Sequence, residues 1–463
     1  MKLKKLTALL AATTLMASLC LTGCGNSSAG TESKSTGDAT AESTSDVAKT
    51  SDSQTNSNKP YDGVTINWIS QGVGDTSWEG LTKPILEKFE EETGIHVNTE
   101  FYSFSDLFEV IETKASSKAD DFDVMSVDVT YVSKYGLSGY LEPLDPFFTA
   151  DEKKEWTDAA YSAGCWGNVM YAAPENTSTQ ILWYNKTLLE KAGITVPEND
   201  AEHRLTYEQV ADLAKQGLEK LDPDKSQGLI GFDFQQVSRV YQMNMLPNSM
   251  GGANIGDDGF VVDGVINTDP WINSMTWYQN LVKDGIASKG YDADQLPEYF
   301  YSGKMLFMVG GTWTPKSMTS EDEIGFAYAP CFKGYEDKAA TATGSWYFGV
   351  NSNSKQREAA AEFVKYFTLG EGNDMWLEIN GDMPCRSDKL DEIMADGADY
   401  PEYLKIGAYE AQNTAVARAV TPAFGEYSTI LDLTWEDVRN GADVKEALDR
   451  AVSQIDSATA AYK

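Results

Sequence analysis

Val64-Thr65-Ile66-Asn67-Trp68-Ile69 is the first apolar run after a long polar stretch, and its pattern predicts a buried strand. A helix follows, because Leu81, Ile85 and Phe89 recur on one helical face. Gly94 is placed to end that helix. The order then repeats with a strand at 95–97, a helix near 105–118 and a strand at 122–127. Strand, helix, strand, helix and strand in this order predict a parallel sheet with right-handed crossovers.

Chain length and charge narrow the class of protein. The 463 residues exceed what one hydrophobic core usually serves, so we expect two lobes or domains. The hydrophobic fraction of 41% and the aromatic fraction of 11% are typical of a globular protein. The formal net charge of -34 repels phosphate backbones and anionic headgroups, which argues against nucleic acid as a partner. Solubility outside the cell explains such a charge.

The N-terminus resembles a bacterial secretory signal. Lys2, Lys4 and Lys5 precede an apolar run at 6–21 that is too short and wrongly flanked to span a membrane. Leu21-Thr22-Gly23-Cys24 then resembles a lipobox, in which the thiol receives a diacylglyceryl group and the cysteine becomes the mature N-terminus. An ordinary signal peptide with a chance cysteine is the alternative.

A polar tether is predicted behind this cysteine. Residues 25–59 are mostly Ser, Thr, Asn, Asp, Ala and Lys without an aromatic side chain, and this composition cannot bury a core. A flexible chain of this length reaches about 30–35 Å. We therefore divide the N-terminal part into a signal peptide, 1–23, and a lipidated Cys24 with its disordered tether, 24–59.

The cysteines fall into two groups. Cys20 lies in the signal and Cys24 is the predicted lipidation site, whereas Cys165, Cys331 and Cys385 belong to the folded body. An odd number allows at most one disulfide within the body, and burial as small apolar side chains is the alternative.

Motifs for catalysis or metal binding are not found in the sequence. His96 and His203 are its only histidines, so acid–base catalysis by histidine is not expected. No CxxC, Gly-x-Ser-x-Gly, His-Glu-x-x-His or P-loop pattern occurs. Asp222-Pro223-Asp224 and Asp257-Asp258-Gly259 are interpreted as turns, because neither completes a calcium loop. We expect no enzymatic activity, no metal and no cofactor.

Four segments of the body follow one another in a characteristic order. They are Phe89-Glu90-Glu91-Glu92-Thr93-Gly94-Ile95-His96-Val97; Asp123-Val124 with Gly139-Tyr140-Leu141-Glu142-Pro143-Leu144-Asp145; Phe300-Tyr301-Ser302-Gly303-Lys304-Met305 with Gly311-Thr312-Trp313; and Asn351 to Phe367 with Met383-Pro384-Cys385-Arg386. Together they resemble the family 1 extracellular solute-binding proteins of bacterial ABC importers, a carbohydrate-binding, maltose-binding-protein-like group. Each motif is degenerate alone, but four in order over about 60–460 are specific.

The resemblance implies an α/β fold of the periplasmic-binding-protein type (type II). In this fold two hinge-connected lobes enclose a ligand cleft at the carboxyl ends of strands. We place the crossings between the lobes near 172–180, 338–347 and 385–400. Lobe 1 then covers 61–173 plus 346–390, and lobe 2 covers 176–340 plus 396–463.

Candidate ligand-binding residues follow from the chemistry of a sugar. Its hydroxyl edges and apolar faces need aromatic platforms with a few directed polar groups. Trp313 follows a buried strand in a Gly-Gly-Thr-Trp turn, and the resemblance implies that this ring stacks on the ligand. The other candidates lie at strand ends or near the crossings: Gln71, Asp128, Glu175, Trp346 and Tyr347, with Trp78 and Tyr131 as weaker ones that could equally be core or surface.

The resemblance implies an extracellular, lipid-anchored component of an ABC transporter that captures a carbohydrate, an oligosaccharide in the first place. Such a monomer would deliver its ligand to the transmembrane permease subunits from the outer face of a Gram-positive-type cell membrane. Ser178 stands where maltose-binding protein has a glutamate, so the glucosyl specificity of that protein does not transfer. The same fold binding a peptide, a polyamine or a polyol is the alternative, and a cell-surface glycosidase is a third.

Overall fold

The structure is a computed structural model that describes residues 59–72, 78–313 and 321–463. The chain divides into two units after residue 56, and the described residues all belong to the second. The predicted signal peptide, Cys24 and the tether up to residue 58 lie outside the described residues. Among the helices that are described, none is long and apolar enough to span a membrane.

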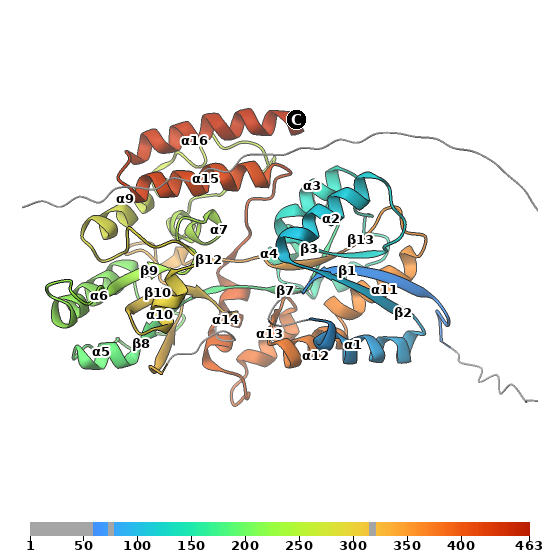
Figure 1. The fold of residues 1–463 in the computed structure, drawn as a ribbon, viewed down its shortest axis with the longest axis horizontal. Coiled ribbons are helices and arrows are strands. Elements are labelled where there is room, and N and C mark those ends of the chain that lie inside the picture. Colours follow the sequence, from blue (N-terminus) through green and yellow to red (C-terminus); the bar gives the residue numbers. More distant parts are fainter. Residues whose placement is uncertain (1–58, 73–77, 314–320) are drawn as a thin grey trace, which may run out of the picture. The chain divides into compact units, whose positions relative to one another are not determined.

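The first sheet has the strand order β2-β1-β3-β13-β6 (Figure 1). The strands are β1 (Thr65–Gln71), β2 (His96–Tyr102), β3 (Val124–Asp128), β6 (Ala173–Pro174) and β13 (Trp346–Val350). β1 runs parallel to β2 and to β3, which confirms the parallel order predicted from the sequence. β13 runs antiparallel to both β3 and β6, so the complete sheet is mixed.

Helices cover both faces of the first sheet (Figure 1). α2 (Phe104–Ser116) and α3 (Val132–Leu137) lie on one side; α1 (Trp78–Thr93), α11 (Arg357–Thr368) and α12 (Glu371–Asn380) lie on the other. Trp68 packs toward the α11 side, with its ring centroid 5.5 Å from that of Phe363. Ile69, the next residue of the strand, belongs to the buried cluster of Leu107 on the α2 side. The alternation of β1 thus buries both faces of the sheet.

The second sheet has the strand order β11-β8-β10-β9. Its strands are β8 (Gln180–Asn185), β9 (Ile230–Phe234), β10 (Met305–Gly311) and β11 (Ile324–Ala327). β10 is parallel to β9 and antiparallel to β8. The other α-helices of the described residues are α4 (Asp158–Ala163), α5 (Lys186–Lys191), α6 (Tyr207–Leu221), α7 (Val240–Met243), α8 (Met245–Asn248), α9 (Asp269–Lys283), α10 (Leu296–Tyr301), α13 (Ser387–Met394), α14 (Glu402–Asn413), α15 (Phe424–Arg439) and α16 (Val444–Thr459).

Local sequence explains where one of these helices begins. The Thr206 hydroxyl accepts a hydrogen bond from the Gln209 backbone amide, and the Gln209 side chain accepts one from the Thr206 amide. This reciprocal capping box satisfies two donors that a helix N-terminus otherwise leaves unpaired. α6 therefore starts at Tyr207, directly after its cap.

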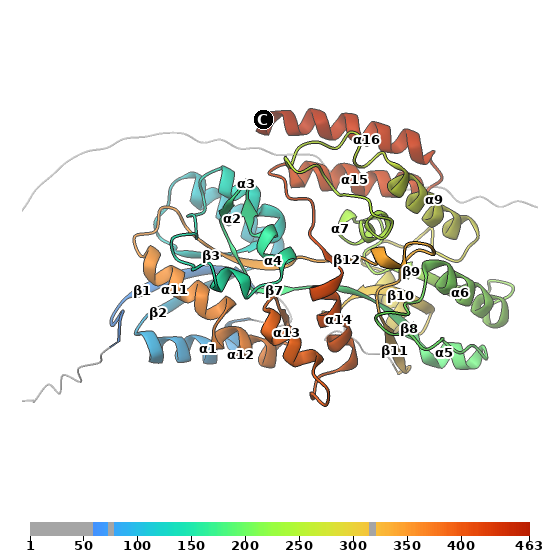
Figure 2. The same cartoon turned by 180° about the vertical axis from the view of Figure 1, so that it is seen from behind.

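Short strand pairs accompany the chain where it passes between the sheets (Figure 2). β7 (Asn176–Thr177) pairs with β14 (Met383–Pro384), and β12 (Thr341–Ala342) pairs with β15 (Ala415–Val416). β6 and β13 belong to the first sheet, whereas β8 and β11 belong to the second. The chain therefore changes sheets between β6 and β8 and returns between β11 and β13. The lobe boundaries drawn from the sequence remain predictions.

The cysteines and acidic turns of the body have simple structural roles. Cys165, Cys331 and Cys385 are free, the last two of them buried. The carboxylates of Asp222 and Asp258 accept hydrogen bonds from nearby backbone amides. These bonds confirm the interpretation of both acidic stretches as turns.

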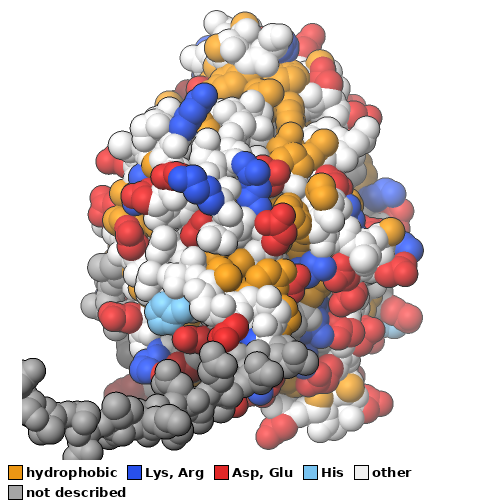
Figure 3. All heavy atoms as spheres, turned by 90° about the vertical axis from the view of Figure 1, so that its right-hand side faces the viewer, with side chains coloured by type: hydrophobic (Ala, Val, Ile, Leu, Met, Phe, Trp, Pro, Cys, Tyr) orange, Lys and Arg blue, Asp and Glu red, His pale blue; other side chains and the backbone are white. Residues whose placement is uncertain are grey.

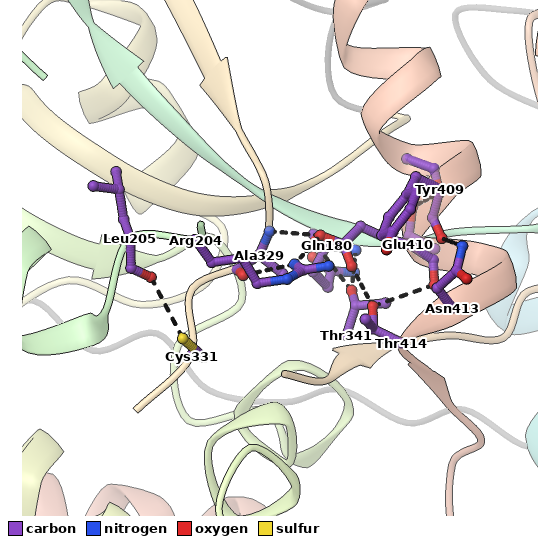
Figure 4. A network of polar contacts seen from close by, with 12 residues as sticks. Gln180, Arg204, Leu205, Ala329, Cys331, Thr341, Tyr409, Glu410, Asn413 and Thr414 are labelled. Atoms are coloured by element: carbon purple, nitrogen blue, oxygen red, sulfur yellow. Dashed lines mark hydrogen bonds and ion pairs between the residues drawn. The ribbon is translucent and has the colours of Figure 1, made fainter. Parts of the chain in front are cut away.

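A buried ion pair joins α14 to the second sheet (Figure 4). Arg204 Nη1 lies 2.5 Å from Glu410 Oε1, and the two side chains are 5% and 0% exposed. The same carboxylate oxygen accepts a hydrogen bond from the Ala329 amide at 2.8 Å, and Arg204 donates to the Ala329 carbonyl at 3.0 Å. Tyr328 and Tyr409 also place their rings against the guanidinium. The pair is therefore satisfied by hydrogen bonds as well as by charge.

Arg204→Ala is expected to lower the free energy of unfolding by about 3–5 kcal/mol, because it leaves the Glu410 charge buried without its cation. Urea unfolding followed by tryptophan fluorescence measures the loss. Lys445→Ala is the matched control, since Lys445 forms an ion pair of 2.6 Å with Asp449 on the exposed face of α16 and should contribute little. Equal effects of the two substitutions would contradict a special role for the buried pair.

Candidate ligand-binding site

A cavity of about 780 Å³ lies between elements that flank the two sheets. One wall comes from α2, the end of β3, the short helix η1 (Val129–Tyr131) and α3. The opposite wall comes from α7, the segment after β15, α15 and the C-terminal η5 (Ala460–Tyr462). Aromatic and charged side chains share the lining: Tyr131, Tyr241, Phe424 and Tyr462, with Glu112, Asp128, Lys134, Arg239, Arg418, Glu426 and Asp432. The volume is in the range of small-molecule sites.

The carboxylate of Asp128 is fixed at the end of β3. Its Oδ1 accepts hydrogen bonds from the Thr130 amide at 3.0 Å and from the Thr130 hydroxyl at 2.7 Å. Asp128 thereby caps η1 and turns the chain directly after the strand. The carboxyl end of a strand is where open α/β sheets bind ligands, and the capped turn holds this side chain in the cavity wall.

Three aromatic rings lie nearly parallel behind the same wall. The Tyr131 ring, which lines the cavity, stacks on Phe108 at 4.2 Å between centroids and an angle of 12°. Phe108 is also parallel to Trp346, at 6.2 Å and 4°. The inner rings support the outer one, so Tyr131 presents a rigid flat face to a ligand.

Tyr241 is the corresponding ring of the opposite wall. Its hydroxyl lies 2.7 Å from the Ser178 hydroxyl. It also accepts a hydrogen bond from the side-chain amide nitrogen of Gln180 at 2.9 Å. Trp313 lies beside it, with 6.2 Å between ring centroids. Trp313 is half-buried and lies two residues after the end of β10. Two aromatic rings therefore lie together on this side.

Arg418 joins the two walls. Its Nη1 lies 3.3 Å from Asp128 Oδ1. The centre of its guanidinium lies 3.8 Å from the centroid of the Tyr241 ring. The charge of Arg418 is thus matched by a carboxylate of one wall and covered by a ring of the other.

Each cation of the lining has a carboxylate partner. Lys134 lies 2.5 Å from Glu112 and Arg418 lies 3.3 Å from Asp128, both within the lining. Arg239 instead lies 3.1 Å from Asp294, outside it. The lining carboxylates Glu426 and Asp432 form no ion pair among the described residues, so the cavity carries a slight surplus of negative charge. Acidic groups are also spread widely over the protein surface, as Figure 3 shows for one face.

The structure brings together four of the residues predicted for the site. Asp128 and Tyr131 line the cavity directly. Trp346 supports Tyr131 through Phe108, and Trp313 lies beside Tyr241.

The other predicted residues are not found among the described residues of the lining. Gln71 ends β1 and is half-buried. Trp78 packs edge-on against Trp376 at 4.8 Å between centroids. Tyr347 is buried and donates its hydroxyl hydrogen to the Ala160 carbonyl. Glu175 is fully buried, and its backbone amide donates to the Trp346 carbonyl. Trp78 and Tyr347 therefore have packing roles in this structure.

Sequence reasoning missed Tyr241, Arg418, Phe424 and Tyr462. Tyr241 lies on a helix of one turn, and Arg418 lies in the extended segment after β15. Neither position has the periodic pattern or strand-end place that marked the predicted residues. The one signal in the sequence is an aromatic residue in the first turn of a helix, at Phe424.

Asp432→Asn is expected to stabilise the protein at neutral pH. Burial raises the pKa of Asp432 from 3.8 to about 6, so the native state binds the proton more tightly than the unfolded chain does. The resulting stability is complete below about pH 4 and is lost as pH rises through about 6. An asparagine still accepts the hydrogen bond of the Val240 amide but carries no buried charge.

The free energy of unfolding at pH 7.5 should rise by about 1–2 kcal/mol in this variant, with no gain at pH 4. Denaturant unfolding at both pH values measures the difference. Asp437→Asn, on the exposed side of the same helix, serves as the control. A gain that is equal at both pH values would rule out the buried charge as its cause.

Comparison with known families identifies a match over most of the body. Residues 75–373 match the family described as bacterial extracellular solute-binding protein, which confirms the resemblance predicted from the four segments. The mannitol-binding protein of Pseudomonas aeruginosa is 23% identical over 56% of this chain and 58% of its own length. The sn-glycerol-3-phosphate-binding periplasmic protein of Rhizobium meliloti is 23% identical over 63% of this chain and 68% of its own. The matched part thus spans about three fifths of the mannitol-binding protein.

A solved structure shows the likeness of the fold. The maltose-binding periplasmic protein MalE of Listeria monocytogenes, in complex with maltose, superposes with a TM-score of 0.71 at 18% identity. The superposition covers 86% of this chain and 98% of the other. It confirms the predicted two-lobed α/β fold of the periplasmic-binding-protein type, whose sheets here are mixed and not purely parallel.

Proposed function

Because this chain belongs to the bacterial extracellular solute-binding proteins, we propose that it captures a carbohydrate, preferably an oligosaccharide. It then delivers this ligand to the permease of an ABC transporter. Solute-binding proteins of ABC importers bind their ligands and are not catalytic. The observation that carries the proposal is the cavity with an aromatic ring on each wall, Tyr131 and Tyr241, among carboxylates and hydroxyl groups. Sugar rings need apolar platforms and polar groups in this combination.

The charges of the cavity favour an uncharged ligand. A phosphate group is bound by cations that have donors to spare. Lys134 and Arg418 are each paired with a carboxylate of the lining, and Arg239 is paired beside it. A phosphorylated polyol would have to compete with those carboxylates, and it would be repelled by Glu426 and Asp432, which have no ion-pair partner in the described part of the chain. An uncharged sugar or polyol meets no such repulsion.

The lipid anchor belongs to the same proposal. Cys24, outside the described residues, carries the diacylglyceryl group. Its two acyl chains make the anchoring stable, since each buried CH₂ contributes about 0.8 kcal/mol. The tether 24–59 then lets the body reorient at the outer face of the membrane. The lobes, 61–173 plus 346–390 and 176–340 plus 396–463, close around the ligand by a hinge motion.

Titration calorimetry with a panel of oligosaccharides, free polyols and phosphorylated polyols tests the ligand class. We expect binding of at least one uncharged sugar or polyol without turnover, and weaker binding of its phosphate ester. Trp313→Ala should lower the affinity about tenfold or more, because the ring beside Tyr241 is lost. Tyr335→Ala is the control, since Tyr335 is exposed and lies outside the cavity lining.

Three results would contradict the proposal. Tighter binding of a phosphate ester than of its parent would reject an uncharged ligand. Steady release of product would reject a binding protein. Unchanged affinity of the Trp313 variant would remove that ring from the site.

Cys24→Ala tests the anchor. The variant should leave the membrane fraction and be recovered as a soluble protein that binds the same sugar. Uptake by the cell should fall, because the binding protein is no longer held beside its permease. Cys20→Ala, within the signal, should leave the membrane fraction unchanged. Retention of the Cys24 variant in the membrane would mean that another feature anchors the chain.

A further inference from the structure

Arg418 contacts a residue of each cavity wall, Asp128 and Tyr241. Its side chain and that of Asp128 are 15% and 11% exposed, so bulk solvent screens their ion pair only weakly. The central carbon of the guanidinium lies over the Tyr241 ring, 3.8 Å from its centroid. A planar cation over an aromatic ring is favourable, and more so where water is excluded. One side chain therefore holds a carboxylate of the first wall and a ring of the second.

The Tyr241 ring is itself fixed by the chain segment that leads from the first sheet to the second. Its hydroxyl contacts Ser178 at 2.7 Å and Gln180 at 2.9 Å. Ser178 also donates to the carbonyl of Gly344, in the segment that returns to the first sheet. The ring on which Arg418 lies is thus connected to two of the segments that cross between the sheets.

The returning segment makes room for the guanidinium. Gly344 has a φ of +124°, a conformation that residues with a side chain rarely adopt. A Cβ atom at this position would lie 3.0 Å from Arg418 Nε and 2.9 Å from Val129 Cγ1. Glycine is therefore required here so that the Arg418 side chain has room between Tyr241 and the crossing segment.

These contacts fix the position of Arg418. Asp128 matches its charge and Tyr241 lies against its guanidinium, whereas Nε has no hydrogen-bond partner among the described residues. Arg418 can therefore act on a ligand through the two groups that it holds, the Asp128 carboxylate and the Tyr241 ring.

We propose that Arg418 is a positioning residue that holds the two walls of the cavity at the separation a bound solute requires. Movement of the walls apart must break the ion pair with Asp128, because Arg418 and Tyr241 both belong to the second wall. The bridge therefore favours the closed arrangement even without ligand. Binding of a solute that touches both walls then has to contribute less free energy to close the cavity. The identity of the solute rests on the proposed function, but the position of the walls does not.

The separation of the walls can be measured without any solute. Nitroxide labels are placed at Ser138→Cys, after α3, and at Ser453→Cys, on α16, in the full chain with its native cysteines replaced by alanine. Both serines are exposed. Pulsed electron resonance then gives the distribution of distances. Arg418→Gln is expected to shift this distribution to longer distances and to raise the ratio of open to closed molecules about tenfold.

Further variants separate the bridge from a general loss of structure. Asp128→Asn should shift the distances in the same direction, and the double variant should add little to the larger single effect. Arg418→Lys keeps the charge but not the planar group, so an intermediate shift is expected. Gly344→Ala should act like Arg418→Gln, because the added Cβ displaces the guanidinium.

Arg450→Gln is the matched control. Arg450 forms an ion pair of 3.2 Å with Asp437, and both residues lie on the paired helices α15 and α16 of one wall. Its loss should leave the distance distribution unchanged. Unchanged distances in both the Arg418 and the Asp128 variants would overturn the proposal. Failure of every sugar to bind would instead overturn the carbohydrate assignment and leave the distance result standing.

Discussion

The pairing of β13 with β3 is the constraint on which the fold and the site both depend. Trp346 lies opposite Asp128 in this antiparallel register. Residues far apart in the chain thus meet at the strand end that forms the cavity wall. All four strands of the second sheet lie between β3 and β13 in the sequence, so the strand that completes the first sheet comes after them in the chain. Closure of such a long loop costs entropy that only the completed packing repays.

The strands behind one wall could be predicted from the sequence, and so could the position of a polar residue at a strand end. The strands 64–69, 95–97 and 122–127 were predictable because their patterns are local and the helices between them are amphipathic. Asp128 followed from the rule that ligands lie at the carboxyl ends of strands. Trp346 was nominated for its place near a crossing, but its role behind Phe108 depends on a tertiary contact that no local pattern encodes.

The opposite wall could not be predicted in the same way. Tyr241 comes from a helix of one turn and Arg418 from an extended segment, so neither carries a periodic signal. Their importance arises from contacts with Ser178, Gly344 and Asp128, which are distant in sequence. Conversely, Tyr347 had the same local signal as its neighbour Trp346. Alternation along β13 placed it on the other face of the strand, where its hydroxyl is used by the Ala160 carbonyl.

The distribution of strong and weak contacts suits movement between the walls. α14 is joined to the second sheet by the Arg204–Glu410 pair, and the first sheet is completed by the whole length of β13. The strand pairs that accompany the crossings, β7 with β14 and β12 with β15, are only two residues long. Short pairs offer few hydrogen bonds to break, so displacement costs least there. A single bridge across the cavity, as proposed for Arg418, can bias the position of both walls, because the strand pairs between them contribute few hydrogen bonds.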